Sequence, residues 1–478
     1  MIGPGEAPTQ RGAAIAGALL AVLVALSLAG DVYRIPVQVS DSLDLIERAH
    51  ELPSVGASFM DGLTSSSRKF RPLRTMQTKL LLEMADRAGG RYHLVFRGFH
   101  VLLVVLLVAL FWHLVGGGTW AAVAALALGF AVLTGMHTFT GLLREAFPIN
   151  VFLLVIVCGL SLLALARTRG GWAVDTIAAA VFAIGVLTLE SGLLIGVVAV
   201  AAYVGGLRGV SRRGLAAIMI LGVIYFVVRI GFLDVTASTV RLEGTGYLTR
   251  WLTGDEQIRQ FGQPPVRLYA YTVAMSLLSV VLSQPEAGRW TVAVAYLNGT
   301  VPPVFWLEMG TSLAATLLLV WYALSKQDDG LRRWRDPVVL VFVVTLVANA
   351  VLSATYAKDE IISFAGTFFA LAVATAASHA LRRACSVGPA ATVALAFVFA
   401  VASCGWTMRA AGLHFKLRHG AFDARSEWAA VLAPGDAGPV RDPQRLELVT
   451  GLREEAIRRR TVAPSQLPRW AERWWGED

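Results

Sequence analysis

The sequence predicts an all-α protein, a polytopic transmembrane helical bundle with a long outer loop that carries surface helices. Two observations predict this class. The chain has 478 residues, of which 56% are hydrophobic and only 16% are charged, whereas soluble domains are about a quarter charged. Apolar runs of about 17 or more residues recur along the chain, as membrane helices require, and no alternating strand pattern competes with them.

The charge distribution is typical of a protein that contacts a lipid bilayer. The net charge of +9 comes from arginine clusters between the apolar runs, and this pattern orients membrane proteins rather than binding nucleic acid. We therefore expect no nucleic-acid partner. The three cysteines, Cys158, Cys385 and Cys404, lack the spacing of a zinc site or a disulfide framework.

The first apolar run, Ala14–Gly30, reads either as a cleavable signal peptide or as a retained anchor, and the many later runs favour the anchor. An outer loop, 31–97, follows. The other expected spans lie near 99–115, 120–136, 149–166, 172–189, 193–204, 215–232, 304–324, 337–353, 361–379 and 390–406. We expect about eleven crossings if the run 268–282 is only half-inserted, and about thirteen if both it and 287–300 cross.

The short loops predict the orientation, because long loops translocate largely regardless of their charge. Basic residues gather in four connections that we expect on the cytoplasmic side: 167–169, 208–213, 326–335 and 382–383. The outer loop 31–97, the loop 136–148, the turn at Glu190, a second outer segment at 234–303 and the loop 356–360 then lie outside. Residues 1–406 form the expected membrane domain, and 407–478 form a small polar tail on the outer side.

The outer loop carries most of the polar residues of interest. Asp41 and Asp44 are three residues apart and share a face of a helix. Pro72 is placed to open a second helix. Its expected apolar face would lie on a membrane surface, with the charged residues pointing elsewhere. This face consists of Leu73, Met76, Leu80 and Met84, and the charged set consists of Arg74, Glu83, Asp86 and Arg87.

Each polar candidate also has a simpler structural interpretation. Asp41 follows Ser40 at an expected helix start, where an acid commonly caps backbone N–H groups, and Asp44 is four residues from Arg48. In this simpler interpretation Arg71 and Arg74 are lipid-headgroup anchors, Glu190 is a turn acid, and the remaining candidates belong to solvated loops. These remaining candidates are His137, Arg144, Glu145 and Lys358. The ionisable residues of the spans lie near the expected outer ends, which favours a surface enzyme over an ion pathway.

Several motifs together resemble the GT-C superfamily of membrane glycosyltransferases. Within it, the chain is similar to polyprenyl- or dolichyl-phosphate-sugar-dependent protein O-mannosyltransferases and their TPR-bearing relatives, without the TPR array. The matching features are the acids that open the outer loop, Arg71-Pro72-Leu73, His100 at the second span, His137 with Arg144-Glu145, Leu189-Glu190-Ser191-Gly192, Tyr225 with Arg229, and Ala357-Lys358-Asp359-Glu360.

The resemblance implies sugar transfer from a polyprenyl-phosphate carrier to a hydroxyl of a protein or glycan acceptor, with inversion, at the outer face of a bacterial cytoplasmic membrane. Asp41 would be the base, with Asp44 in reserve. Arg71, Arg74 and Arg229 would bind the donor phosphate. The supporting residues would be His137, Glu145, Glu190 and Lys358. Glu190 or Glu145 would orient a basic residue or help to hold a divalent metal, Mg²⁺ or Mn²⁺, which some relatives use and others do not.

A non-enzymatic protein on the same scaffold is the alternative: a transporter, a flippase or an assembly partner. An outward cavity around Asp41 and Arg71 would favour sugar transfer. A polar path that continues to the cytoplasmic face would favour transport.

Overall fold

The computed structural model describes residues 6–35, 40–64, 70–116, 118–144, 149–232, 245–325, 336–431, 447–452 and 454. Most of these residues lie in helices, as the sequence predicts. The regular strands among the described residues are β1, Gly246–Tyr247, and β2, Arg250–Trp251, which form an antiparallel pair. The all-α class is therefore confirmed for this part of the chain.

The N-terminal half supplies α1 (Glu6–Arg34), α2 (Ser40–Glu51), α3 (Val55–Thr64), α4 (Pro72–Arg87), α5 (Tyr92–Val115), α6 (Trp120–Gly135), α7 (His137–Arg144), α8 (Val151–Ala166), α9 (Trp172–Thr188), the 3₁₀ turn η1 (Glu190–Gly192), α10 (Leu193–Val204), α11 (Arg212–Phe226) and the π-helical turn η2 (Val227–Phe232). The C-terminal half supplies α12 (Gly254–Phe261), α13 (Val266–Leu282), α14 (Thr291–Leu297), α15 (Pro303–Leu324), α16 (Pro337–Leu352), α17 (Asp359–Val387) and α18 (Pro389–Val431).

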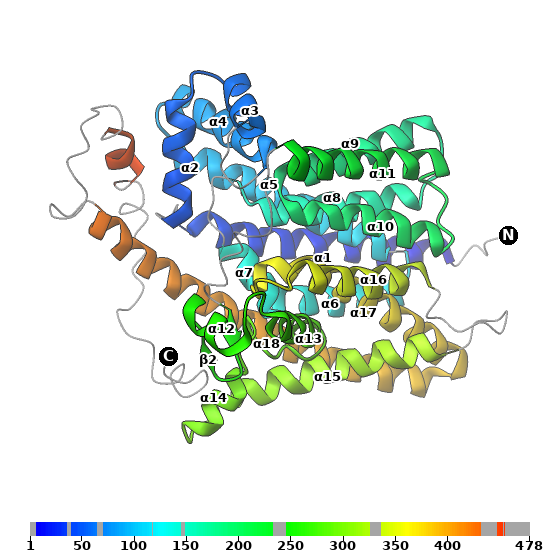
Figure 1. Cartoon of the computed structure of the whole chain (residues 1–478). Helices are drawn as coiled ribbons and strands as arrows, with labels where there is room; N and C mark the ends of the chain where they lie inside the picture. Colours follow the sequence, from blue (N-terminus) through cyan, green and yellow to red (C-terminus); the bar gives the residue numbers. More distant parts are fainter. Residues whose placement is uncertain are drawn as a thin grey trace.

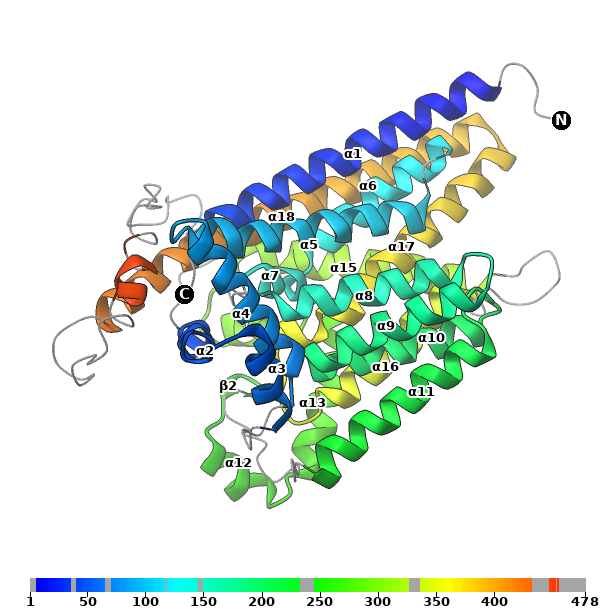
Figure 2. The same cartoon turned by 90° about the horizontal axis from the view of Figure 1, so that it is seen from above.

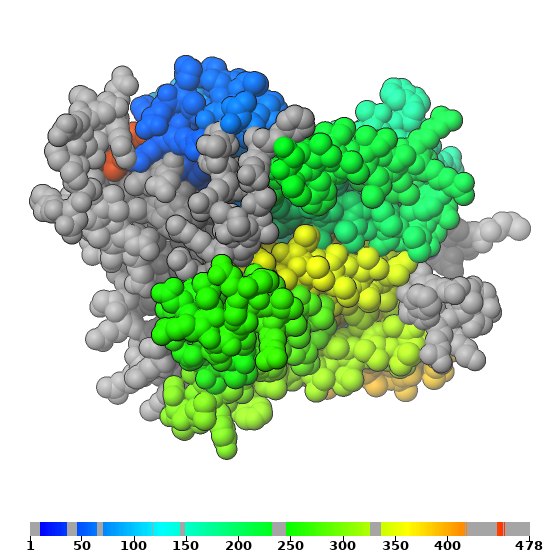
Figure 3. All heavy atoms as spheres, in the orientation of Figure 1, coloured from blue at the N-terminus to red at the C-terminus, as the bar shows by residue number. Residues whose placement is uncertain are grey.

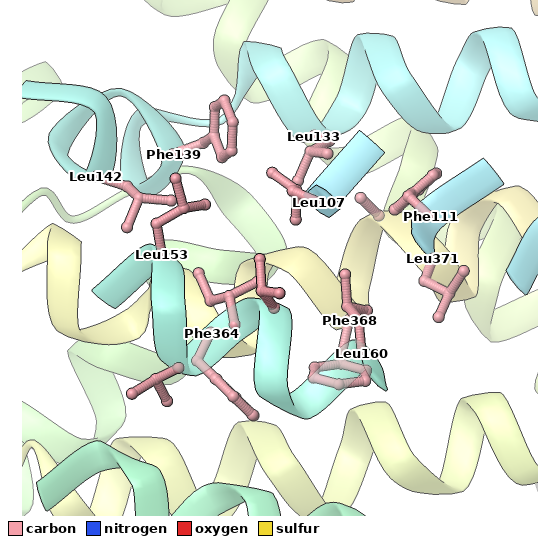
Figure 4. Close-up of a cluster of buried hydrophobic side chains, with 14 of the residues drawn as sticks. Leu107, Phe111, Leu133, Phe139, Leu142, Leu153, Leu160, Phe364, Phe368 and Leu371 are labelled. Atoms are coloured by element: carbon pink, nitrogen blue, oxygen red, sulfur yellow. The ribbon is translucent and has the colours of Figure 1, made fainter. Parts of the chain in front are cut away.

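Helix α17 lies inside the bundle, between α6 and α7 on one side and α16 on another (Figure 2). Its buried face is rich in alanine and phenylalanine, because small side chains let neighbouring helices approach and aromatic rings fill the remaining space. Figure 4 shows the resulting apolar cluster, to which α5, α6, α7, α8 and α17 contribute. The labelled members are Leu107, Phe111, Leu133, Phe139, Leu142, Leu153, Leu160, Phe364, Phe368 and Leu371.

Six of the described helices are long and apolar enough to cross a membrane, and eight do so if each bent pair, α6 with α7 and α12 with α13, counts as one span. This is compatible with an integral multi-pass membrane protein. Helix length does not support the expected eleven to thirteen crossings. Four more apolar helices have only 10–17 residues, and at about 1.5 Å per residue they are shorter than a hydrocarbon core of about 30 Å.

The segment expected to be ambiguous consists of two unequal helices. α13 packs against α15, α16 and α17, with Leu268 and Val280 fully buried. The run 287–300 contains only the seven-residue helix α14, which is too short to cross. α18 continues through residue 406 to Val431, so no helix end marks the expected start of the tail.

The outer loop folds into α2, α3 and α4. Pro72 occupies the first position of α4, as predicted. Helix α3 packs closely against the start of α4, since a Cβ on Gly62 of α3 would lie only 2.6 Å from the Cα of Pro72. Of the expected apolar face, Leu80 and Met84 are 43% and 47% exposed, whereas Leu73 and Met76 are partly buried. Arg74 was expected among the outward charged residues, but it is 7% exposed because it lies on the packed side of the helix.

The outer-loop helices, α7, α12 and the β1–β2 pair gather at one end of the bundle (Figure 1). Figure 3 shows the surface of the same view, with the outer-loop helices at the upper left and the segment around α12 at the lower left. The turns before α9 and before α11 lie against each other at the opposite end, where the Gly209 N–H donates to the Ala166 carbonyl over 2.9 Å.

Candidate functional site

Glu190 joins two arginines from distant parts of the chain. The Arg71 Nε–H donates to Glu190 Oε2 over 2.9 Å, and Arg71 Nη2 lies 2.7 Å from the same oxygen. Arg229 Nη1 lies 3.1 Å from Glu190 Oε1 and donates a 2.6 Å hydrogen bond to the hydroxyl of Tyr225. We call Arg71, Glu190, Arg229 and Tyr225 the arginine–carboxylate site.

Local structure holds each member of this site in place. Arg71 immediately precedes Pro72, which fixes the start of α4, and the neighbouring Phe70 is buried with its ring centroid 5.5 Å from that of Tyr225. Glu190 opens the turn η1 between α9 and α10. This turn is tight because Gly192 approaches the backbone of Gly185, where a Cβ would lie 2.2 Å from a carbonyl carbon.

A helical irregularity positions the second arginine. Tyr225 lies in the last turn of α11, one residue before its end, and is 3% exposed. Arg229 follows four residues later in the π-helical turn η2, and such turns are frequent at functional sites. The guanidinium and the phenol therefore lie on one face of the helix.

The electrostatics keep Glu190 ionised. Burial alone would raise the pKa of this turn carboxyl, but the charge and hydrogen bond of Arg71, together with the charge of Arg229, lower its pKa to about 2. Two guanidinium groups therefore face one carboxylate. Their side chains remain 19% and 22% exposed, so an anionic ligand can reach them.

The arginine–carboxylate site has donor groups of the kind that bind phosphate. Within the part of the chain that the structure describes, Nη1 of Arg71 and Nε and Nη2 of Arg229 take part in no hydrogen bond or ion pair. Guanidinium N–H groups form short, charge-assisted hydrogen bonds to phosphate oxygens. The site also carries one net positive charge, which favours an anion.

The other predicted site residues either lie away from the arginine–carboxylate site or have side chains outside the described part of the structure. The backbone of Asp41 and Asp44 lies in α2, but their side chains fall outside the described part of the structure, as does Glu145. Arg74 is buried on α4. Lys358 lies over the ring of Tyr356, with its Nζ 5.1 Å from the ring centroid.

His137 is placed at a second polar location. It begins α7, is 6% exposed, and its Nε2 lies 3.6 Å from Oδ1 of Asp359, the first residue of α17. The same oxygen accepts a hydrogen bond from the N–H of Ala287 over 2.9 Å. The sequence had suggested a solvated loop for both residues, and the structure instead brings them together.

The residues present do not form a metal site within the described ranges. Among them, no group of three histidine, cysteine, aspartate or glutamate residues is close enough to hold an ion. Both oxygens of Glu190 face arginines, so this carboxylate orients basic side chains.

Sequence reasoning missed two buried polar connections. His414 Nδ1 lies 2.6 Å from Oδ2 of Asp31 and joins α18 to α1. Arg409 donates to Ser283, Thr311 and Ser312. In the sequence, Asp31, Arg409 and His414 each follow the end of an apolar run, in segments whose composition is that of a polar loop or tail. This position was the available signal of the two connections.

An apolar groove runs between α1, α6 and α18. Its volume is about 1010 Å³, and Asp31 and His414 lie among its lining residues. Most of its lining is aliphatic or aromatic, including Leu20, Val24, Phe130, Ala131 and Met408.

Comparison with known proteins gives no relative: no protein-family model matches the chain, and neither a curated protein nor a solved structure matches it.

Proposed function

We propose that the chain is an inverting glycosyltransferase that moves a sugar from a polyprenyl-phosphate carrier to an acceptor hydroxyl at the outer face of a membrane. The observation that supports this proposal is the arginine–carboxylate site. Two guanidinium groups 158 positions apart in the chain, those of Arg71 and Arg229, are held by one carboxylate at the end of the bundle that carries the outer-loop helices.

The arginines would act on the leaving group. In the transfer, the acceptor oxygen forms a bond to the anomeric carbon while the bond from that carbon to the phosphate oxygen breaks. Polyprenyl phosphate leaves with one additional negative charge. Preorganised arginines stabilise this charge as it develops, so the leaving group needs no proton.

A carboxylate would accept the acceptor's proton. Asp41 is the proposed base and Asp44 is the reserve, since both lie on α2 at the same end of the bundle. A single displacement by a base-assisted hydroxyl inverts the anomeric centre. The groove between α1, α6 and α18 offers apolar volume for the polyprenyl tail.

The proposal includes a membrane arrangement. The arginine-rich turns would lie in the cytoplasm and the arginine–carboxylate site would face outward, in a bacterial cytoplasmic membrane. A count of about eleven crossings would also require the four shorter apolar helices, α8, α9, α10 and α16, to cross, with local thinning of the bilayer.

A purified-protein assay tests the function. The full chain in detergent is incubated with polyprenyl-phosphate mannose, glucose and galactose, each labelled in the sugar, together with glycan and peptide acceptors. We expect label to move from the lipid to one acceptor or, more slowly, to water. Binding of polyprenyl phosphate without any turnover of the panel would favour a transporter or flippase.

A further inference from the structure

His137 is a buried polar side chain whose hydrogen-bonding capacity is unused. It lies at the 68° bend between α6 and α7, and neither ring nitrogen has a hydrogen-bond partner among the described residues. Burying an imidazole in this way is unfavourable unless a further group satisfies it. The position therefore points to a ligand that completes the hydrogen bonding.

Asp359 supplies the second half of a binding site. Its side chain is 23% exposed, so it connects the buried imidazole with solvent. The 3.6 Å separation between His137 Nε2 and Asp359 Oδ1 is longer than a hydrogen bond between them. Both ring nitrogens of His137 are closed off in this structure, so a small shift of the two side chains would let a hydroxyl oxygen enter within hydrogen-bonding distance of both atoms. It would accept from the imidazole N–H and donate its own proton to the carboxylate.

An exposed tryptophan, Trp251, lies on the β1–β2 pair, which is hydrogen-bonded to the loop that contacts Asp359. The Gly246 N–H donates to the Ala287 carbonyl over 3.1 Å, and the Trp290 N–H donates to the Leu248 carbonyl over 2.8 Å. These bonds fix the β1–β2 pair beside the loop that contacts Asp359. Trp251 of β2 is 48% exposed, with the guanidinium carbon of Arg289 over its ring, 5.2 Å from the centroid. A sugar ring would therefore pack on the other face of the indole.

We propose that His137 and Asp359 bind the acceptor of the transfer, and that this acceptor is a neutral glycan. The pair would hold one sugar hydroxyl, and Trp251 would pack on a neighbouring ring. The assignment to an acceptor rests on the proposed function. Both residues are positioning residues, and the proton acceptor of the reaction remains Asp41.

Glycan binding can be measured without the reaction. The full chain in detergent is mixed with maltotriose, cellotriose and mannotriose, and saturation-transfer difference NMR reports binding. We expect at least one trisaccharide to bind wild type. His137→Gln and Asp359→Asn should each weaken that binding by about tenfold or more, the usual effect of losing a hydrogen bond to a charged or buried polar group.

Matched controls separate the site from general effects of the substitutions. His113→Gln and Asp255→Asn change the same residue types at exposed positions and should leave binding unchanged. His137→Leu removes the buried polar nitrogens, so it should fold with at least wild-type thermal stability and still lose binding. Asp359 is partly exposed, so its variant remains informative if the buried His137 variants fail to fold.

Three outcomes would overturn the inference: no trisaccharide binds wild type, binding is equal in wild type and the two variants, or wild type binds only a serine- and threonine-rich peptide. Donor turnover provides the separate test of the proposed function. In an active enzyme, His137→Gln should raise the acceptor KM about tenfold while donor hydrolysis continues. Glycan binding without donor turnover would support the binding site and contradict the proposed transferase function. Donor turnover without glycan binding would support the transferase function and contradict the binding site.

Discussion

Glu190 lies between Arg71 and Arg229, with one carboxylate oxygen facing each guanidinium. Oε2 is 2.7 Å from Arg71 Nη2, and Oε1 is 3.1 Å from Arg229 Nη1. The carboxylate thereby joins the outer-loop helix α4 to the end of α11. Because it neutralises only one of the two cations, the same contact stabilises the fold and leaves positive charge for a ligand.

Glu190→Gln should destabilise the protein and disturb both arginines. The amide keeps the shape but loses the charge, so two cations would face each other without compensation. Because the side chains are about a fifth to a quarter exposed, we expect a loss of about 1 to 2 kcal/mol rather than the larger cost of a fully buried pair. Thermal unfolding in detergent measures this effect. Glu83→Gln, in the surface pair with Arg87, is the control and should cost less than about 0.5 kcal/mol.

The stability contribution of Glu190 should depend on pH only in acid. Its pKa is about 2 in the folded protein and about 4.3 in an unfolded chain, so the folded state favours the ionised form. This contribution is complete above the unfolded value and is lost as pH falls toward about 2. The difference in melting temperature between wild type and Glu190→Gln should be constant from pH 6 to 8 and shrink below about pH 4. A difference that changes between pH 6 and 8 would contradict the assignment.

Arg71→Lys should weaken use of the lipid-phosphate donor. Lysine keeps the charge but loses the planar fork through which Arg71 contacts Glu190 with Nε and Nη2. We expect the donor KM to rise about tenfold or more, with unchanged insertion into the membrane. Arg87→Lys, at a largely exposed position on the same helix, is the matched control. An equal donor KM in both variants would contradict phosphate binding by Arg71 and favour the simpler interpretation, in which Arg71 only anchors the helix at the lipid headgroups.

Asp41→Asn should fold normally and lose turnover. Asparagine retains a capping side chain of nearly the same volume, but it cannot accept a proton at neutral pH. A general base contributes on the order of a hundred- to ten-thousand-fold. Sugar transfer is measured at saturating donor, with thermal stability in parallel. Asp44→Asn is the control on the same helix, and a collapse of activity confined to that variant would transfer the role to Asp44.

Thiol labelling should report the orientation. After Cys385 and Cys404, which are both exposed, are replaced by serine and the buried Cys158 is kept, a cysteine introduced at Ser66 should react with a membrane-impermeant reagent in intact cells. In the same background, a cysteine introduced at Asp329 should react only after the membrane is opened, because this residue lies in an arginine-rich connection. Labelling of the Asp329 position alone in intact cells would reverse the proposed topology.

Much of the secondary structure was predictable because it depends on local composition. Glycine, proline and charged residues bound the apolar runs, so the expected spans 120–136 and 172–189 match α6 and α9 within one residue at each end. Pro72 marked the start of α4 for the same reason. The number of crossings was not predictable in this way, because apolar residues beside a helix lengthen the apolar run in the sequence without belonging to the helix.

The site itself depended on contacts between distant segments. Glu190 and Arg71 are 119 positions apart, and no local pattern indicates that one carboxylate meets two arginines. His137 and Asp359 each looked like residues of a solvated loop, yet the bend after α6 and the start of α17 bring them within 3.6 Å. The sequence by itself determined the helical class and the positions of many of the apolar helices, since these follow from short-range propensity and hydrophobicity. Only the tertiary structure decided which charges are buried and paired, because that depends on how helices far apart in the chain pack together.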